Sequence, residues 1–176
     1  MRAGVNIVLC GFMGCGKTTV GRLLAQMSGR SFVDMDEYIE TAQGRSISDI
    51  FRADGEAAFR AAEREACRDL SRRTGLVIAT GGGALVDRRN AVLLSQTGVV
   101  VLLEVPLPVL SERLKGDKNR PLLQRADREE AMQSLYEARL PCYRRAARFW
   151  VDASRAPRDV CREILQKLGA APDNAL

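Results

Sequence analysis

Histidine is absent from this chain of 176 residues. Without an imidazole the chain cannot form a Ser-His or Cys-His nucleophile pair, so acid–base chemistry must fall to carboxylates or lysines. The cysteines are scattered, at positions 10, 15, 67, 142 and 161, and no two have CxxC spacing. With no histidine to complete a ligand set, a zinc site is excluded. We expect reduced thiols that mainly fill the core, with Cys15 as the exception in reactivity.

Long apolar runs are also missing. No stretch approaches the roughly 18 apolar residues that indicate a membrane helix. The first ten residues, MRAGVNIVLC, run directly into an expected strand, which leaves no room for a signal peptide. We therefore expect a cytoplasmic protein with no membrane partner.

Aromatic residues are few, at 5%, and the 27 Lys and Arg against 22 Asp and Glu give a net charge of +5. A basic chain can bind nucleic acid. Here, however, the basic residues mostly alternate with acids, as in RAAEREACRDLSRR, which is typical of a solvated helix face. An arginine-lined pocket for a small anion explains the excess equally well. With one Trp and no recognisable binding motif, we expect no nucleic-acid partner.

Short apolar runs alternate with longer segments of helical period along the whole chain. The expected strands are 5–10, 31–34, 76–80, 99–104 and 148–152, and the expected helices are 17–28, 35–41, 47–72, 88–96, 107–115, 128–146 and 158–168. This alternation predicts an α/β fold with a parallel sheet covered on both faces. We expect one domain over 1–176, with its ligands beyond the carboxyl ends of the strands.

The polar segment KGDKNRPLLQRAD, residues 115–127, lacks periodicity and lies between two good helices. A plain loop of this length is uncommon in a small domain, and a closing lid is a frequent reason for one. We favour a lid over a plain loop.

The segment GFMGCGKT matches the pattern G-x-x-x-x-G-K-[ST] through Gly11, Gly16, Lys17 and Thr18, and it lies between an expected strand and an expected helix. Glycines let successive amides turn inward around an anion at the helix N-terminus. Lys17 would then reach the β- and γ-phosphates and the Thr18 hydroxyl would hold Mg²⁺. The alternative is a glycine-rich turn with an exposed lysine.

The segment FVDMDEY places Asp34 and Asp36 two residues apart where a strand ends. Strand alternation would send both side chains to one side. One carboxylate could then support the metal through water while the other bonds an acceptor hydroxyl. The alternative is that either aspartate simply caps the next helix.

Three consecutive glycines, Gly81, Gly82 and Gly83, follow the strand expected at 76–80. Glycines in series are costly in backbone entropy, so close approach of a ligand to the backbone is a natural explanation. A tight turn is the alternative.

Arginines supply the remaining candidates. Arg60 and Glu63 stand at i, i+3 on one helix face, where Glu63 could hold the guanidinium still. Arg120 falls in the expected lid, and Arg139 in the next helix. Arginine suits bidentate capture of carboxylate or phosphate. Taken singly, each is more typical of a solvated surface charge.

Together these motifs resemble the shikimate kinase family: GFMGCGKT, DMD, FRAAE, TGGG, RPLL and RLPCY occur in the family's order, and SRAPRDV extends the similarity to almost the whole chain. The resemblance implies a P-loop NTPase-like three-layer α/β/α fold. It implies a five-stranded parallel sheet in the order 2-3-1-4-5, with a lid and a shikimate-binding region at about 34–63. It also implies transfer of phosphate from ATP, with Mg²⁺, to the 3-hydroxyl of shikimate on the route to chorismate and the aromatic amino acids.

The resemblance assigns roles by motif position. The catalytic residues would be Lys17, Asp36 and Arg120. The ATP site would comprise Gly14, Cys15, Gly16, Lys17, Thr18, Thr19, Arg113, Arg120 and Arg155, the shikimate site Asp36, Arg60, Gly81, Gly82, Gly83 and Arg139, and the metal site Thr18 with Asp34 through water.

Two other classes share the phosphate loop. Gluconate kinase is the nearest enzyme alternative, but its polyol substrate needs less arginine. A nucleotide switch protein should carry N-K-x-D for guanine, and GDKNR at 116–120 holds similar letters in the wrong order. No heptad or large apolar stripe is evident, so we expect a monomer.

Overall fold

The core of the molecule is a five-stranded sheet in the order β2-β3-β1-β4-β5, with every neighbouring pair parallel. The computed structural model describes residues 4–115 and 127–170. The strands are β1 (Asn6–Cys10), β2 (Ser31–Asp34), β3 (Leu76–Ala79), β4 (Gly98–Glu104) and β5 (Phe149–Asp152). The predicted sheet and its order are confirmed.

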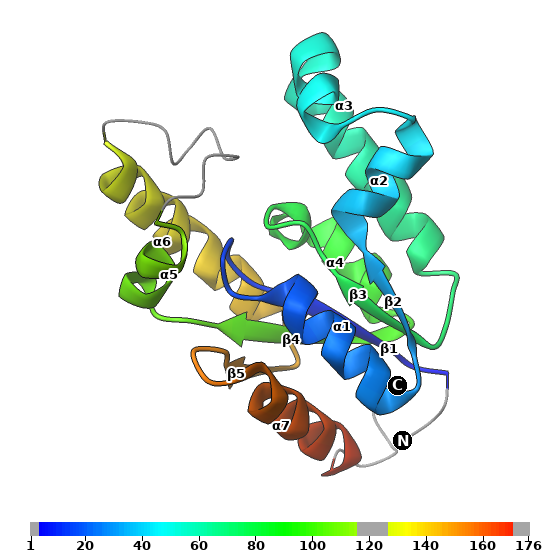
Figure 1. The fold of residues 1–176 in the computed structure, drawn as a ribbon. Helices are drawn as coiled ribbons and strands as arrows, with labels where there is room; N and C mark the ends of the chain where they lie inside the picture. Colours follow the sequence, from blue (N-terminus) through cyan, green and yellow to red (C-terminus); the bar gives the residue numbers. More distant parts are fainter. Residues whose placement is uncertain (1–3, 116–126, 171–176) are drawn as a thin grey trace.

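Helices cover both faces of this sheet, which gives three layers (Figure 1). The helices are α1 (Lys17–Ser28), α2 (Met35–Gln43), α3 (Ile47–Leu70), the short 3₁₀ helix η1 (Ala84–Val86), α4 (Arg88–Ser95), α5 (Leu107–Arg113), α6 (Arg128–Ala146) and α7 (Pro157–Ala170). Helices α1 and α7 pack together on one face, and α4 packs against both α3 and α6 on the other. In the part of the chain that the structure describes, no helix is long and apolar enough to cross a membrane.

Strands β1 and β3 are buried along their whole length, as continuous apolar runs in a covered parallel sheet should be. Four of the five cysteines are buried as free thiols, in agreement with the expectation that they fill the core. Burial raises the pKa of Cys10 and of Cys67 to about 12, so both thiols stay protonated at neutral pH.

Helix α3 differs from the uninterrupted helix predicted over 47–72. Gly55 lies inside it with φ 78° and ψ −179°, a non-helical conformation that a glycine adopts without a Cβ penalty. The rings of Phe51 and Phe59, one on each side of this break, contact each other with centroids 4.8 Å apart. The break divides α3, and α2 with the first part of α3 forms an arm that extends beyond the sheet (Figure 1).

Two polar side chains tie the loops to the ends of the central strands. At the amino end, buried Asn6 donates to the Arg73 carbonyl at 2.7 Å and accepts from the Leu76 amide at 2.9 Å. At the carboxyl end, the amide and the hydroxyl of Thr80 both donate to the Leu9 carbonyl at 3.0 Å. The loops after β1 and β3 are therefore fixed side by side.

Replacing Asn6 by alanine should lower the free energy of unfolding by about 2–3 kcal/mol. The change leaves the Leu76 amide and the Arg73 carbonyl without these partners in a buried place, which costs more than a simple lost contact. Urea unfolding followed by circular dichroism measures the change. The control is Val92→Ala on α4, where the side chain is 52% exposed and the expected effect is within about 0.5 kcal/mol. An unchanged unfolding midpoint in Asn6→Ala would contradict this account.

Candidate functional site

The phosphate-binding motif forms a tight loop between β1 and α1. Gly11 has φ 144°, and a Cβ there would lie 2.6 Å from the Leu103 carbonyl oxygen, so no other residue fits. Gly16 is the N-cap of α1 with φ 94°. The first amides of a helix have no acceptor within the helix, and they carry the positive end of its dipole. The loop therefore presents the anion-binding geometry that the pattern predicts.

Lys17 begins α1 and folds back over the loop. Its Nζ donates to the Gly11 carbonyl at 2.9 Å and to the Phe12 carbonyl at 3.1 Å. The same Nζ lies 3.7 Å from Sγ of Cys15, a side chain that is only 1% exposed. The ammonium is thus held by carbonyls of the loop itself, while burial of Cys15 argues against the reactivity expected of its thiol.

Thr18 and Asp34 meet beside this loop, where the Thr18 hydroxyl donates to Asp34 Oδ2 at 2.8 Å. Asp34 is also the N-cap of α2, since its Oδ1 accepts from the Asp36 amide at 3.1 Å. The N-cap interpretation of Asp34 is therefore confirmed, while its support of a metal through water stays a prediction. The expected strand alternation is wrong, because β2 ends at Asp34 and Asp36 lies in the first turn of α2.

Gly81 and Gly83 of the TGGG loop each leave room for a charged side chain, and a third charged side chain lies beside Gly82. A Cβ on Gly81 would lie 2.7 Å from Asp36 Oδ1, and one on Gly83 would lie 2.6 Å from Arg60 Nη1. A Cβ on Gly82 would stand 3.6 Å from Arg139 Nη1. The loop thus brings Asp36 from α2, Arg60 from α3 and Arg139 from α6 to one place. These side chains approach the glycines closely, and the predicted approach of a ligand to the loop backbone stays a prediction.

Arg60 is held by two carboxylates of its own helix. Its Nη1 pairs with Glu63 at 2.5 Å and its Nη2 with Glu56 at 3.1 Å. Glu63 is 1% exposed, and burial raises its pKa despite the hydrogen bond from Arg60. Burial disfavours the charged guanidinium too, but the bonds to Glu63 and Glu56 leave the pKa of Arg60 raised. The guanidinium is therefore charged and oriented, as the i, i+3 spacing predicts.

The carbonyl of Gly82 receives two donors from α6. Arg139 Nη1 donates to it at 3.3 Å, and the hydroxyl of Tyr143 donates to it as well. Tyr143, the last residue of the segment RLPCY, was not among the predicted site residues. Its position one helical turn after Arg139 could have indicated a shared site, because residues at i and i+4 lie on the same helix face.

Arg113 and Arg155, both expected in the ATP site, have different hydrogen-bond partners. Arg113 donates to the Gly14 carbonyl at 3.4 Å and to the Ala153 and Ser154 carbonyls at 3.0 and 3.2 Å, so it borders the phosphate loop. Arg155 donates to the Asp152 carbonyl at 3.2 Å and pairs with Glu163 on α7. Its partners in the structure are thus on β5 and α7.

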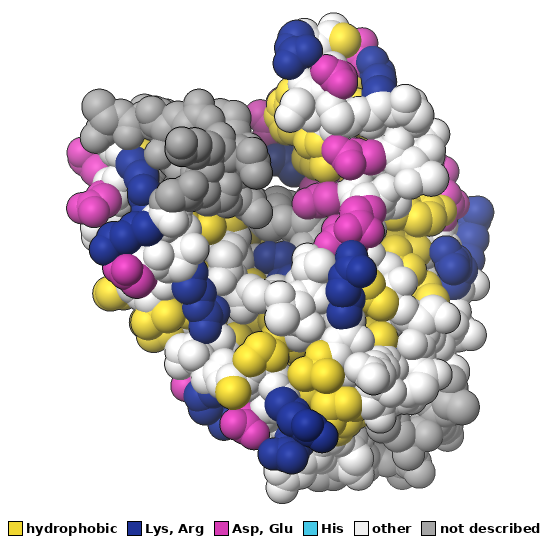
Figure 2. All heavy atoms as spheres, viewed as in Figure 1, with side chains coloured by type: hydrophobic (Ala, Val, Ile, Leu, Met, Phe, Trp, Pro, Cys, Tyr) yellow, Lys and Arg dark blue, Asp and Glu magenta, His cyan; other side chains and the backbone are white. Residues whose placement is uncertain are grey.

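Arg120 and all but the ends of the lid expected at 115–127 lie outside the described residues. The molecule is hollowed between the arm of α2 and α3 and the remainder of the chain, and acidic and basic side chains gather at this edge (Figure 2). The hollow agrees with the convergence of charged groups at the TGGG loop.

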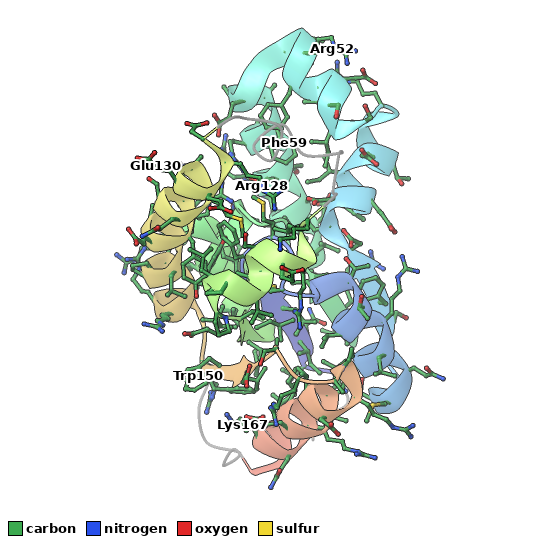
Figure 3. All side chains as sticks on the ribbon, turned by 60° about the vertical axis from the view of Figure 1, so that its left-hand side comes forward. Arg52, Phe59, Arg128, Glu130, Trp150 and Lys167 are labelled. Atoms are coloured by element: carbon green, nitrogen blue, oxygen red, sulfur yellow. The ribbon has the colours of Figure 1, made fainter. Side chains whose placement is uncertain are left out.

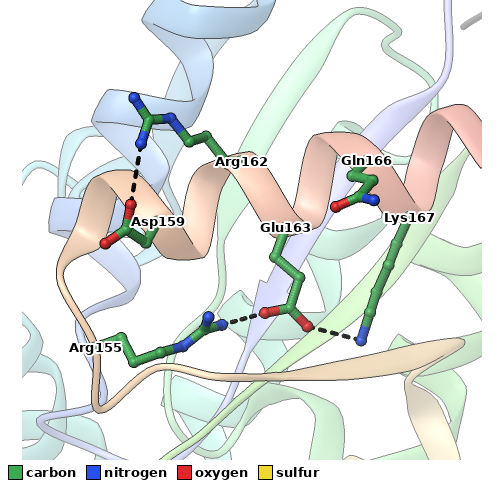
Figure 4. Close-up of a pocket in the computed structure, with 6 residues that line it drawn as sticks. All are labelled: Arg155, Asp159, Arg162, Glu163, Gln166 and Lys167. Carbon is green, nitrogen blue, oxygen red and sulfur yellow. Dashed lines mark hydrogen bonds and ion pairs between the residues drawn. The ribbon is translucent and has the colours of Figure 1, made fainter.

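Another hollow lies along α7. It is lined by Arg155, Asp159, Arg162, Glu163, Gln166 and Lys167. Arg155, Glu163 and Lys167 form a chain of ion pairs along it (Figure 4). Its charged groups are paired with one another, so it lacks the convergence seen at the glycine loop. Lys167 also lies over the exposed ring of Trp150, at the end of the molecule opposite Arg52 (Figure 3).

Comparison with known proteins agrees with this geometry. The family model described as shikimate kinase matches residues 13–169. The chain is 43% identical over 166 residues to the shikimate kinase of Psychrobacter cryohalolentis, covering 94% of this chain and 89% of that protein. It is 45% identical over 159 residues to the shikimate kinase of Aromatoleum aromaticum, covering 90% and 91%.

Solved structures give the same result. The shikimate kinase of Acinetobacter baumannii in complex with shikimate superposes with a TM-score of 0.89 at 42% identity, over 94% of this chain and 93% of that one. A gluconokinase from Sinorhizobium meliloti has a TM-score of 0.61 at 20% identity over 96% and 94%, a similarity that extends to the fold alone. By sequence and by structure, this chain belongs to the shikimate kinase family.

Proposed function

We propose that this enzyme transfers the γ-phosphoryl group of ATP to the 3-hydroxyl of shikimate, giving shikimate 3-phosphate and ADP, on the route to chorismate and the aromatic amino acids. The observation that carries the proposal is the meeting of Asp36, Arg60 and Arg139 at the TGGG loop. Two guanidiniums suit a carboxylate and one aspartate suits a hydroxyl, so the set matches a small hydroxy acid. The loop leaves the same sheet edge as the phosphate loop, which supports binding of acceptor and donor side by side.

The proposed chemistry uses alignment and charge neutralisation. The 3-hydroxyl oxygen attacks the γ-phosphorus as the bond to the β,γ-bridging oxygen breaks, and ADP leaves with that bond's electron pair. Asp36 orients the hydroxyl and accepts its proton late in the transfer. Lys17, and Arg120 in the lid, offset charge on the phosphoryl oxygens, since phosphoryl transfer depends mainly on positioning and electrostatics.

The nucleotide would lie along the phosphate loop. We assign its phosphates to the amides and side chains of residues 14–19 and its adenine to the space flanked by Arg113 and Arg155. The contact of Arg113 with the Gly14 carbonyl supports this placement. Arg155 would flank the adenine while its guanidinium stays paired with the Glu163 carboxylate.

Mg²⁺ fits the same corner of the site. Among residues 4–115 and 127–170, no group of three or more His, Cys, Asp or Glu side chains is arranged to hold a metal. Mg²⁺ in such sites usually needs only one or two protein groups, with substrate phosphates and waters completing its shell. The Thr18 hydroxyl and the Asp34 carboxylate, 2.8 Å apart, suit that need, Thr18 directly and Asp34 through water. The bound ion would neutralise charge on the phosphates.

We also propose that the whole chain, 1–176, acts as a single kinase domain and works as a cytoplasmic monomer. Gel filtration with light scattering, with and without nucleotide, tests the monomer. A mass of twice 19.3 kDa would reject it.

The decisive test is ADP release from Mg-ATP with shikimate, gluconate, nucleoside monophosphates or no acceptor. We expect turnover with shikimate well above the other three, and a product with one new phosphate ester at the 3-oxygen by phosphorus NMR. Equal rates with gluconate would favour the gluconate kinase alternative. ADP release independent of any acceptor would favour a simple nucleotide hydrolase.

Lys17→Ala should lower kcat with shikimate by about 10²–10³-fold, the usual loss when one preorganised charge is removed from a transition state. Steady-state kinetics at saturating substrates measure it. Lys167→Ala is the control, a lysine paired with Glu163 on α7. Wild-type kcat in Lys17→Ala would contradict the assignment.

Arg60→Ala should instead raise the KM for shikimate by about 10- to 100-fold, as expected for lost hydrogen bonds between charged groups, with a much smaller change in kcat. Arg68→Ala on the same helix, an exposed arginine paired with Glu65, is the matched control.

Because Arg60→Ala leaves the buried Glu63 without its partner, its thermal stability is measured in parallel. Arg60→Lys provides a second variant that keeps the charge but loses the planar fork, and its KM for shikimate should also rise. An unchanged KM in both folded variants would remove Arg60 from the acceptor site.

Asp34→Asn should raise the Mg²⁺ concentration for half-maximal activity by about tenfold, the usual effect of removing a supporting group behind a metal. Asparagine can still cap α2, so the fold should persist. Asp87→Asn, which changes the N-cap of α4 in the same way, is the control. A magnesium titration at fixed ATP concentration measures both. An identical magnesium requirement in Asp34→Asn and the wild-type enzyme would argue against this metal site.

A further inference from the structure

Tyr143 has a buried polar group that the assigned roles do not use. The side chain is 2% exposed and lies on α6, one turn after Arg139. Its ring fills the core, a purpose that phenylalanine would serve as well. The hydroxyl must therefore be explained separately, because burying it without a partner is costly.

The partner of this hydroxyl is the Gly82 carbonyl, which also accepts from Arg139 at 3.3 Å. One backbone oxygen in the acceptor loop thus holds two donors from neighbouring turns of α6. The hydroxyl and the guanidinium are also close enough that Arg139 works against the effect of burial, which raises the pKa of Tyr143 to about 12. At any physiological pH the hydroxyl is protonated and donates.

The orientation of the loop follows from this bond. The described chain has no cis peptide bond, so the carbonyl of Gly82 and the amide of Gly83 point in opposite directions. Anchoring the carbonyl to α6 turns the amide away from α6. The glycines have no side chains to fix this peptide by packing, and η1, which follows the loop, packs against α6 (Figure 1).

We propose that Tyr143 is a positioning residue of the acceptor site: its hydroxyl fixes the Gly82 carbonyl and thereby the direction in which Arg139 presents its guanidinium to the substrate carboxylate. This inference rests on the proposed shikimate kinase activity. With the carbonyl already held by Tyr143, Arg139 needs to give only one of its five N–H donors to the loop, and the others remain for the substrate.

The test variant is Tyr143→Phe, which keeps the buried ring. We expect the KM for shikimate to rise about fivefold, the size of one lost hydrogen bond, while kcat stays within about twofold and the KM for ATP is unchanged. The matched control is Tyr136→Phe, also on α6, whose hydroxyl donates to the Val105 carbonyl at 3.2 Å. It loses the same kind of bond outside the acceptor loop, so its KM for shikimate should stay at the wild-type value.

A double-mutant cycle separates positioning from general loosening of the fold. If Tyr143 acts through Arg139, adding Tyr143→Phe to Arg139→Ala should change the KM for shikimate by less than about twofold. An additive fivefold effect in that background, or an unchanged KM in Tyr143→Phe alone, would overturn the proposal. Absence of shikimate turnover in the wild-type enzyme would instead overturn the proposed function, and this inference with it.

A measurement on the wild-type sequence covers the case in which Tyr143→Phe does not fold. The chain has three tyrosines, at positions 38, 136 and 143. Incorporated 3-fluorotyrosine gives three fluorine resonances. The resonance lost in Tyr38→Phe belongs to Tyr38, the one lost in Tyr136→Phe belongs to Tyr136, and the remaining resonance belongs to Tyr143. Shikimate should shift the Tyr143 resonance and leave that of Tyr136 in place. A Tyr143 resonance unmoved at saturating shikimate would overturn the proposal.

Discussion

The carbonyl oxygen of Leu9 accepts from both the amide and the hydroxyl of Thr80, at 3.0 Å each. Leu9 lies two residues before the phosphate loop, and Thr80 immediately precedes the three glycines. In a parallel sheet the carboxyl ends of adjacent strands meet at one edge, and this pair of bonds fixes the two loops there. The remainder of the site depends on that spacing, because the donor phosphate and the acceptor hydroxyl must meet within bonding reach.

The charged groups are arranged so that each one has an internal partner. Lys17 is held by carbonyls of its own loop, Asp34 by Thr18 and an amide, and Arg60 by Glu63 and Glu56. The burial of Glu63 is the least expected of these, since a carboxylate at 1% exposure is costly without a cation. Arg60 supplies the cation, and Glu63 in turn limits the rotamers of Arg60. Little orientational freedom is left to lose when a substrate binds.

The sequence predicted much of this arrangement because its motifs carry physical constraints. Buried strands, the loop around Lys17 and the spacing of Arg60 and Glu63 are local patterns, and the structure agrees with each. Asp36 does lie beside the glycine loop, but the reason predicted for its direction was wrong, since a helical turn and not strand alternation orients it. The break at Gly55 escaped notice because one glycine within a strong helical period does not by itself distinguish a break from a tolerated residue.

Contacts between residues far apart in the chain could not be predicted from the sequence. Nothing local indicates that Tyr143 donates to Gly82, 61 residues away, or that Arg155 pairs with Glu163 on α7. The same applies to the glycines, whose series suggested a ligand near the backbone. The atoms that approach are Asp36, Arg60 and Arg139, brought in by three helices that only the complete fold places together.

The TGGG loop has a consequence for how such enzymes diversify. It contributes space and backbone to the acceptor site, while all the side chains come from α2, α3 and α6. Acceptor preference is therefore encoded on the surrounding helices, and the sheet and its loops can be inherited unchanged. Under the proposed function, a different acceptor would require substitutions on those helices.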